Sequence, residues 1–222
     1  MSDSAQITYG NELARKGIHI TSLLIPIIYL QISRPAALWI LVPMMVVAIL
    51  IDMLMHYHEP TRALMLRLFG SLLRDHELRT DRLLLNGASW VLIAATLMVL
   101  LFPKVIAVTA FSILIISDTF AALVGRRFGT RPFLDKSVVG TMTFILTAIV
   151  VVGVYAAIYS LPWTYVASGA IGAVLGGVAE AGSIRLKLDD NISIPFSIAI
   201  TMLVLGIAVE AQGLPAFIGA LS

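Results

Sequence analysis

The chain has 222 residues, of which 59% are hydrophobic and 13% are charged, and its mean hydropathy is +0.97. Soluble domains are about 45–50% apolar and about 25% charged, so this composition excludes an ordinary soluble protein and indicates that the bilayer is the solvent. The net charge of +2 gives no reason to expect nucleic acid as a partner. The absence of cysteine excludes disulfides and thiolate metal sites.

Apolar runs of membrane-spanning length follow one another along most of the chain. Each crossing needs about 20 apolar residues, and seven spans are predicted at residues 17–33, 36–55, 86–102, 104–124, 138–160, 163–184 and 192–210. We therefore expect an all-α integral membrane protein in which residues 1–222 form a single polytopic domain. No cleavable signal is expected before the first span, and no plant-type transit peptide, which favours a prokaryotic cell membrane.

The segment 59–82, between the second and third spans, is amphipathic. Leucines recur there at helical spacing and arginines occupy other positions, as shown by Leu64, Leu68, Leu72, Leu73, Arg62, Arg67, Arg74 and Arg79. This pattern predicts one interfacial helix that lies on the membrane surface.

The distribution of Lys and Arg predicts the orientation. With the N-terminus inside, 13 of the 15 basic residues fall in cytoplasmic segments, and only Arg34 and Lys104 fall on the other side. Cytoplasmic loops of membrane proteins carry such an excess of basic residues. We therefore expect the N-terminus inside and the C-terminus outside. If one span were missing, the basic segments after it would change sides and the excess on the cytoplasmic side would be lost.

Two carboxylates lie inside apolar spans. Asp118, in the fourth span, is about 9 Å from the predicted cytoplasmic end at about 1.5 Å per residue, and Glu180, in the sixth, lies at a similar depth. A charge at a helix centre costs about 2.5–3.5 kcal/mol on insertion scales, so such residues usually face a cavity or a partner. A functional role is favoured, with a structural hydrogen bond between the spans as the alternative.

The loop after Asp118 is rich in glycine and cations. Glycine lets a backbone approach phosphate closely, and cations offset phosphate charge. The Walker-A pattern does not occur. We interpret the loop as a phosphate site, with an ordinary positive-inside loop as the alternative; its residues are Gly125, Arg126, Arg127, Gly129, Lys136 and Ser137.

Three oxygen-bearing side chains precede the seventh span: Asp189, Asp190 and Asn191. Mg²⁺ takes oxygen ligands, and for Asp190 a functional role is favoured. Asn191 could equally cap the last helix. Mg²⁺, or another divalent cation, is predicted to bind Asp118, Glu180 and Asp190.

Near the N-terminus, spacings of three and four place Glu12, Arg15, Lys16 and His19 on one helical face. A membrane-surface anchor would explain Arg15 and Lys16, but it would not require His19 just inside the first span. Asn86, at the start of the third span, is a further candidate.

Taken together, the motifs resemble those of the CTP-dependent lipid-alcohol kinases, a family that includes dolichol kinase, phytol and farnesol kinases and the yeast-type CTP-dependent diacylglycerol kinase. The resemblance covers residues 12 to 196, approximately. Its motifs are Glu12-x-x-Arg15-Lys16-x-x-His19, Ser117-Asp118-Thr119-x-Ala121-Ala122-x-x-Gly125-Arg126-Arg127-Phe128-Gly129, Lys136-Ser137-Val138-x-Gly140-Thr141, and Glu180 followed by Asp190-Asn191-x-x-x-Pro195.

The resemblance implies transfer of the γ-phosphate of CTP to a lipid hydroxyl, such as that of a polyprenol, phytol or diacylglycerol. Phosphoryl transfer needs positioning, cations on the phosphates and a proton acceptor. The catalytic residues expected are Asp118, Lys136, Glu180 and Asp190, and which carboxylate is the base stays open. Nucleotide or phosphate contacts are expected from Arg15, Lys16, Gly125, Arg126, Arg127, Gly129, Ser137 and Asn191. Val139 stands where the family more often has an acidic residue.

Two other functions compete with the kinase. A CTP-dependent cytidylyltransferase would also use CTP, Mg²⁺ and membrane acids, but it would release pyrophosphate. A secondary transporter would show acids at the midplane and inverted repeats, and the sequence shows no such symmetry. A kinase of the cell membrane with its site facing the cytoplasm is favoured, and the sequence does not identify the acceptor lipid or the oligomeric state.

Overall fold

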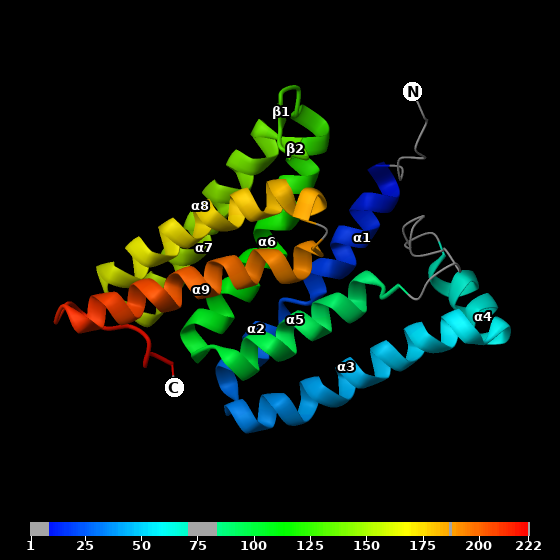
Figure 1. The fold of residues 1–222 in the computed structure, drawn as a ribbon, viewed down its shortest axis with the longest axis horizontal. Helices are drawn as coiled ribbons and strands as arrows, with labels where there is room; N and C mark the ends of the chain where they lie inside the picture. Colours follow the sequence, from blue (N-terminus) through cyan, green and yellow to red (C-terminus); the bar gives the residue numbers. More distant parts are fainter. Residues whose placement is uncertain (1–8, 71–83, 187, 222) are drawn as a thin grey trace.

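The computed structural model describes residues 9–70, 84–186 and 188–221. Residues 71–82 of the predicted amphipathic segment lie outside the described residues, as does the side chain of Glu12. The elements in chain order are α1 (Tyr9–Thr21), α2 (Leu24–Gln31), α3 (Arg34–Tyr57), α4 (Glu59–Phe69), α5 (Gly87–Leu101), α6 (Lys104–Phe128), β1 (Pro132–Phe133), β2 (Lys136–Ser137), α7 (Val138–Tyr159), α8 (Trp163–Leu186) and α9 (Asp190–Ala211) (Figure 1).

Five of the described helices are long and apolar enough to cross a membrane: α3, α6, α7, α8 and α9. Helix α5 is apolar but shorter, with 15 residues. The all-α membrane class is therefore confirmed, while the count of seven spans and their orientation stay predictions. A short antiparallel hairpin, β1–β2, was not expected.

The predicted first span, 17–33, is divided into two helices. The chain turns between α1 and α2 with short-range bonds from Ser22 N to His19 O and from Leu23 N to Ile20 O, both 3.0 Å. Pro26 explains the break, because its ring would clash with the carbonyl of Ser22 in a continuous helix. The segment is therefore two helices, and its crossing of the membrane stays a prediction.

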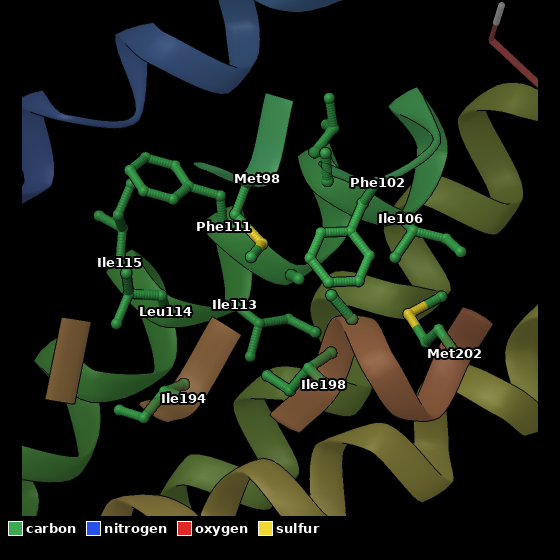
Figure 2. Close-up of a cluster of buried hydrophobic side chains, with 14 of the residues drawn as sticks. Met98, Phe102, Ile106, Phe111, Ile113, Leu114, Ile115, Ile194, Ile198 and Met202 are labelled. Carbon is green, nitrogen blue, oxygen red and sulfur yellow. The ribbon is translucent and has the colours of Figure 1, made fainter. Parts of the chain in front are cut away.

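Helix α6 is the centre of the bundle. It packs against α1, α2, α5, α7 and α9, and most of its apolar length is buried inside the protein. Figure 2 shows its aliphatic and aromatic side chains interlocked with those of α5 and α9; the set includes Met98, Ile106, Phe111, Ile113, Leu114, Ile115, Ile194, Ile198 and Met202. A polar residue on this helix, such as Asp118, is therefore held inside protein rather than in lipid.

Glycines of α8 let its neighbours approach closely. A Cβ added at Gly169 would lie 2.7 Å from Val152 of α7, and one at Gly176 would lie 2.7 Å from Ile198 of α9. A Cβ added at Gly177 would lie 2.7 Å from Ile145 of α7. Such close packing through small residues is typical of membrane helices, and it fixes α7 and α9 beside the end of α8 that carries Glu180.

Helix α4 confirms the helical part of the amphipathic prediction within the described residues. Leu64, Leu68 and Phe69 are exposed on the protein, so they are available to the membrane, and Arg67 is also exposed. Placement of α4 at the membrane surface stays a prediction.

The predicted orientation can be tested with the two variants Thr130→Cys and Gln212→Cys. Both positions are exposed, one in the loop after α6 and one at the end of α9, and the chain has no cysteine of its own. The Lys and Arg bias predicts that a membrane-impermeant thiol reagent applied to intact cells labels only the cysteine at position 212. Labelling of both cysteines from the same side would refute this topology.

Candidate active site

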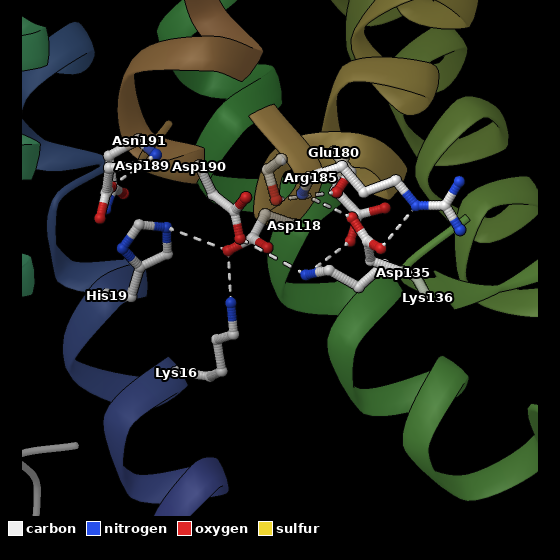
Figure 3. Close-up of polar contacts among 11 residues, drawn as sticks. Lys16, His19, Asp118, Asp135, Lys136, Glu180, Arg185, Asp189, Asp190 and Asn191 are labelled. Atoms are coloured by element: carbon white, nitrogen blue, oxygen red, sulfur yellow. Dashed lines mark hydrogen bonds and ion pairs between the residues drawn. The ribbon is translucent and has the colours of Figure 1, made fainter. Parts of the chain in front are cut away.

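Lys136 lies among acidic side chains from two other elements. Its Nζ is 3.3 Å from Oε1 of Glu180 on α8 and 3.4 Å from Oδ2 of Asp190 at the start of α9 (Figure 3). Burial by itself lowers the pKa of Lys136, but the charges of Asp190, Glu180 and Asp118 outweigh it and raise that pKa above its ordinary value. Lys136 therefore keeps its positive charge throughout the neutral pH range.

Asp118 of α6 forms the second half of the cluster. Its carboxylate accepts a hydrogen bond from Nζ of Lys16 on α1, and His19 Nε2 lies 3.8 Å from Asp118 Oδ2. Both Lys16 and Asp118 are buried. The face of α1 that carries Lys16 and His19 thus meets the membrane acid Asp118 at one site. The same site contains Lys136, Glu180 and Asp190.

The β-hairpin is held against α8 by Asp135. The Asp135 carboxylate accepts hydrogen bonds from Arg185 N (3.0 Å) and Arg185 Nε (2.9 Å), and its backbone N–H donates to Ala181 O (2.9 Å). Leu134 adopts a left-handed conformation with φ of 52° in the turn, a strained state for a residue with a Cβ. These contacts place Lys136 beside Glu180. The sequence analysis did not predict a role for Asp135 or Arg185. The one available signal was that Asp135 directly precedes Lys136.

Ser137 and the loop glycines join α6 to α7. Ser137 Oγ accepts a hydrogen bond from Gly140 N (3.1 Å) and caps α7. A Cβ at Gly129 would lie 2.4 Å from Ser137 Oγ, and one at Gly125 would lie 3.2 Å from Gly140 Cα. The structure therefore gives these residues a packing role, and their contact with phosphate stays a prediction.

Arg126 and Arg127 lie outside the buried cluster, in the last turn of α6, where both side chains are exposed. Arg127 lies over the ring of Phe128, 5.4 Å from its centroid. Their predicted contact with phosphates stays a prediction, and it would be made at the open edge of the site.

Asp189, not Asn191, caps α9. Asp189 Oδ1 accepts hydrogen bonds from Asn191 N (2.9 Å) and Asn191 Nδ2 (2.7 Å). The alternative in which Asn191 is the cap was wrong by two positions, because the helix begins earlier than the predicted span. Asn191 instead lies on the wall of a cavity.

Asn86 caps α5 and is held by Asp52, a residue that the sequence did not single out. Asp52 Oδ2 accepts hydrogen bonds from Asn86 N (2.9 Å) and Ser89 Oγ (2.6 Å), while Asn86 Oδ1 accepts from Ser89 N (3.0 Å). The signal available in the sequence was an aspartate inside the second apolar span. Asn86 is not part of the lysine–acid cluster, but it lines the same cavity.

A cavity of about 760 Å³ leads from the cluster into the apolar region between α1, α2, α3 and α5. Ligand pockets typically have volumes of about 300–1,000 Å³. Its walls are mostly apolar, and its charged groups and side-chain amides are Arg15, Lys16, His19, Asn86, Asp118, Asp190 and Asn191.

The carboxylates only partly fit a magnesium site. Glu180 Oε2 and Asp190 Oδ1 are buried oxygen atoms that accept no hydrogen bond from any described residue. Among the described residues, however, no group of three His, Cys, Asp or Glu is placed to hold a metal ion. Mg²⁺ is usually bound by one or two carboxylates together with substrate phosphates and water. The donors therefore fit Mg²⁺ carried on a nucleotide, and the predicted site of three carboxylates stays a prediction.

Comparison with known proteins gives two relatives. No family model and no solved structure matches the chain. It is 31% identical over 188 residues to the uncharacterized protein RP860 of Rickettsia prowazekii, across 84% of this chain and 90% of that protein. It is 27% identical over 207 residues to CTP-dependent diacylglycerol kinase 1 of Saccharomyces cerevisiae, across 83% of this chain and 70% of the yeast protein.

The Lys16–Asp118 pair predicts a specific effect on stability. Lys16→Met removes the cation and leaves a buried carboxylate, which costs about 3–5 kcal/mol in soluble proteins when one partner of a buried pair is lost. We expect a clearly lower unfolding midpoint in detergent. The double variant Lys16→Met with Asp118→Asn removes both charges and should recover most of the loss. Equal stability of the single variant and the unchanged protein would show that Lys16 does not compensate Asp118.

Proposed function

This chain belongs to the same family as the uncharacterized Rickettsia protein, and from its site we propose that it is a membrane kinase that transfers the γ-phosphate of CTP to the hydroxyl of a lipid alcohol. The observation that carries the proposal is the junction of an apolar cavity with a buried cluster of acids and lysines. The distant likeness to the yeast CTP-dependent diacylglycerol kinase supports the reaction class.

The cavity suits a lipid that carries one polar group. Its apolar walls would hold the hydrocarbon chain, and Asp118 and Asp190 reach its polar end, where a hydroxyl would lie. Glu180 and Lys136 are not on the cavity wall, although Lys136 contacts both Glu180 and Asp190. The two groups of residues therefore suit two substrates, with the lipid on the Asp118 side and the nucleotide phosphates on the Lys136 side.

Asp190 is the best-placed proton acceptor. Its Oδ1 is buried and has no hydrogen-bond partner in the described part of the chain, and the residue lines the cavity, whereas Asp118 already accepts a hydrogen bond from Lys16. In the proposed reaction the lipid hydroxyl oxygen attacks the γ-phosphorus. The bond from this phosphorus to the oxygen bridging it to the β-phosphate breaks, CDP leaves, and the hydroxyl proton passes to Asp190.

Cations would hold the nucleotide at the mouth of the site. Lys136 would act as a point charge on the transferred phosphate, and Arg126 and Arg127, exposed at the end of α6, would contact the outer phosphates. Glu180 would hold Mg²⁺ carried on the nucleotide through its buried Oε2. Bound there, Mg²⁺ would neutralise charge that develops on the phosphates. The predicted orientation places this mouth on the cytoplasmic face of the cell membrane, where nucleotide is present.

The direct test incubates purified protein with Mg²⁺, γ-labelled CTP or ATP, and a panel of phytol, polyprenols and diacylglycerol. The proposal expects label in the lipid and CDP as the second product. Release of pyrophosphate with formation of a CDP-lipid would instead identify a cytidylyltransferase. Efficient transfer from ATP but not from CTP would support the kinase activity and contradict the proposal that CTP is the phosphate donor.

Substitutions in the cluster should separate chemistry from folding. Asp190→Asn keeps the shape of the side chain but removes the proton acceptor, and general-base catalysis is worth about 10²–10⁴-fold in rate. Glu180→Gln and Lys136→Ala should also lower the Mg²⁺-dependent rate steeply, while Arg127→Ala should be milder because that side chain is exposed. The measurement is the rate per folded molecule, with folded yield determined by size-exclusion chromatography. Near-normal rates for Asp190→Asn and Lys136→Ala would remove this site.

A further inference from the structure

One face of α3 lines the cavity along almost the whole helix. The lining residues recur every three or four positions, as a helical stripe does, and include Ala37, Leu41, Met44, Ala48, Ile51 and Met55. From the first to the last of these residues the helix rises roughly 27 Å. The hydrocarbon core of a bilayer is about 30 Å thick, so the stripe is nearly as long as the apolar core.

A second wall is formed by α1, α2 and the residues beside them. Its lining residues include His19, Ser22, Ile25, Tyr29 and Ile32. The charged lining residues belong to the end of the cavity at Lys16, His19 and the acid cluster, and the far end near Ile32 and Ala37 is apolar. The cavity is therefore a slot with one polar end.

We propose that this slot takes the hydrocarbon chain of a lipid alcohol over a length greater than one leaflet, and that Ala48 helps to set the chain length that is accepted. This inference rests on the proposed function. In a bilayer each leaflet supplies about half of the roughly 30 Å core, so a chain that ends within one leaflet would fill only part of a slot that is roughly 27 Å long. The observations favour a long-chain acceptor over a short-chain one.

Ala48 is the small residue within the stripe through which length can be tested. It lies seven residues, or roughly 10 Å, from Met55, which lines the slot at the opposite end from Ala37. A phenyl ring at position 48 would close the slot beyond its first third. Val47, the preceding residue, is 54% exposed and does not line the slot, so Val47→Phe adds similar bulk on the outer face of the same helix.

The experiment measures phosphorylation of geraniol, farnesol, geranylgeraniol and a diacylglycerol by the unchanged protein, Ala48→Phe and Val47→Phe. These alcohols share one head and grow by one isoprene unit at a time. We expect Ala48→Phe to lose at least about tenfold in rate on geranylgeraniol, a discrimination within the range of hydrophobic pockets, and to keep its rate on geraniol. Val47→Phe should keep the profile of the unchanged protein.

Binding of the same lipids, measured by native mass spectrometry, tests the slot without turnover. If binding depends on chain length and Ala48→Phe reduces the longest chain that is bound, but no lipid is phosphorylated, the slot is supported and the kinase activity is contradicted. Phosphorylation with the same length profile in Ala48→Phe and Val47→Phe would overturn the length-setting role and keep the kinase. A higher rate or tighter binding with geraniol than with geranylgeraniol in the unchanged protein would overturn the long-chain acceptor.

Discussion

Carboxylates can be buried at the ends of apolar helices only when cations compensate them. The desolvation cost of a buried ion is several kcal/mol, and a partner must offset it. Here Lys16 compensates Asp118, and Lys136 compensates Glu180 and Asp190. These ion pairs join α1, the β-hairpin, α6, α8 and α9 at one end of the bundle (Figure 3). The positions of the first helix and of the hairpin therefore depend on the same acids.

The apolar packing between helices keeps the acids and lysines of the cluster at the same depth. The glycines of α8 bring α7 and α9 close, so Glu180 and Asp190 emerge side by side. Asp135 and Arg185 then attach the hairpin to the end of α8 and hold Lys136 between the two acids. A larger side chain at Gly176 would clash with the side chain of Ile198 on α9, so the packing between α8 and α9 would have to change.

Much of the site could be predicted from the sequence because the bilayer restricts where charge is placed. Asp118 and Glu180 stand out as acids in apolar spans, and the alternation of spans predicts that they share a side of the membrane. The contact of Lys16 with Asp118 joins positions 102 residues apart, and no local pattern encodes such a pairing. The hairpin was missed because strands of two residues carry no periodicity. The break before Pro26 was visible in principle, but average hydropathy masks a local backbone constraint.

The cavity could not be predicted from the sequence either. The stripe on α3 has the same composition as a surface that faces lipid or packs against a helix, and only the placement of α1 and α2 opposite it makes a slot. That placement follows from the division of the first span, since α1 and α2 contact α6 separately.

The one-ended polarity of the slot gives the proposed reaction a direction. A lipid alcohol carries one neutral hydroxyl, so it can slide along apolar walls until the hydroxyl meets the polar end. The phosphorylated product carries about −1.5 to −2 charge at neutral pH, as phosphate monoesters do, and burying an isolated charge in an apolar region is far more costly than burying a hydroxyl. The phosphate of such a product would therefore be excluded from the slot and would stay at its polar end, beside Arg15 and Lys16. Repulsion from Asp118, Glu180 and Asp190 then opposes its retention there, so the same buried acids that would accept the proton and hold Mg²⁺ would also favour release of the product head into the interface.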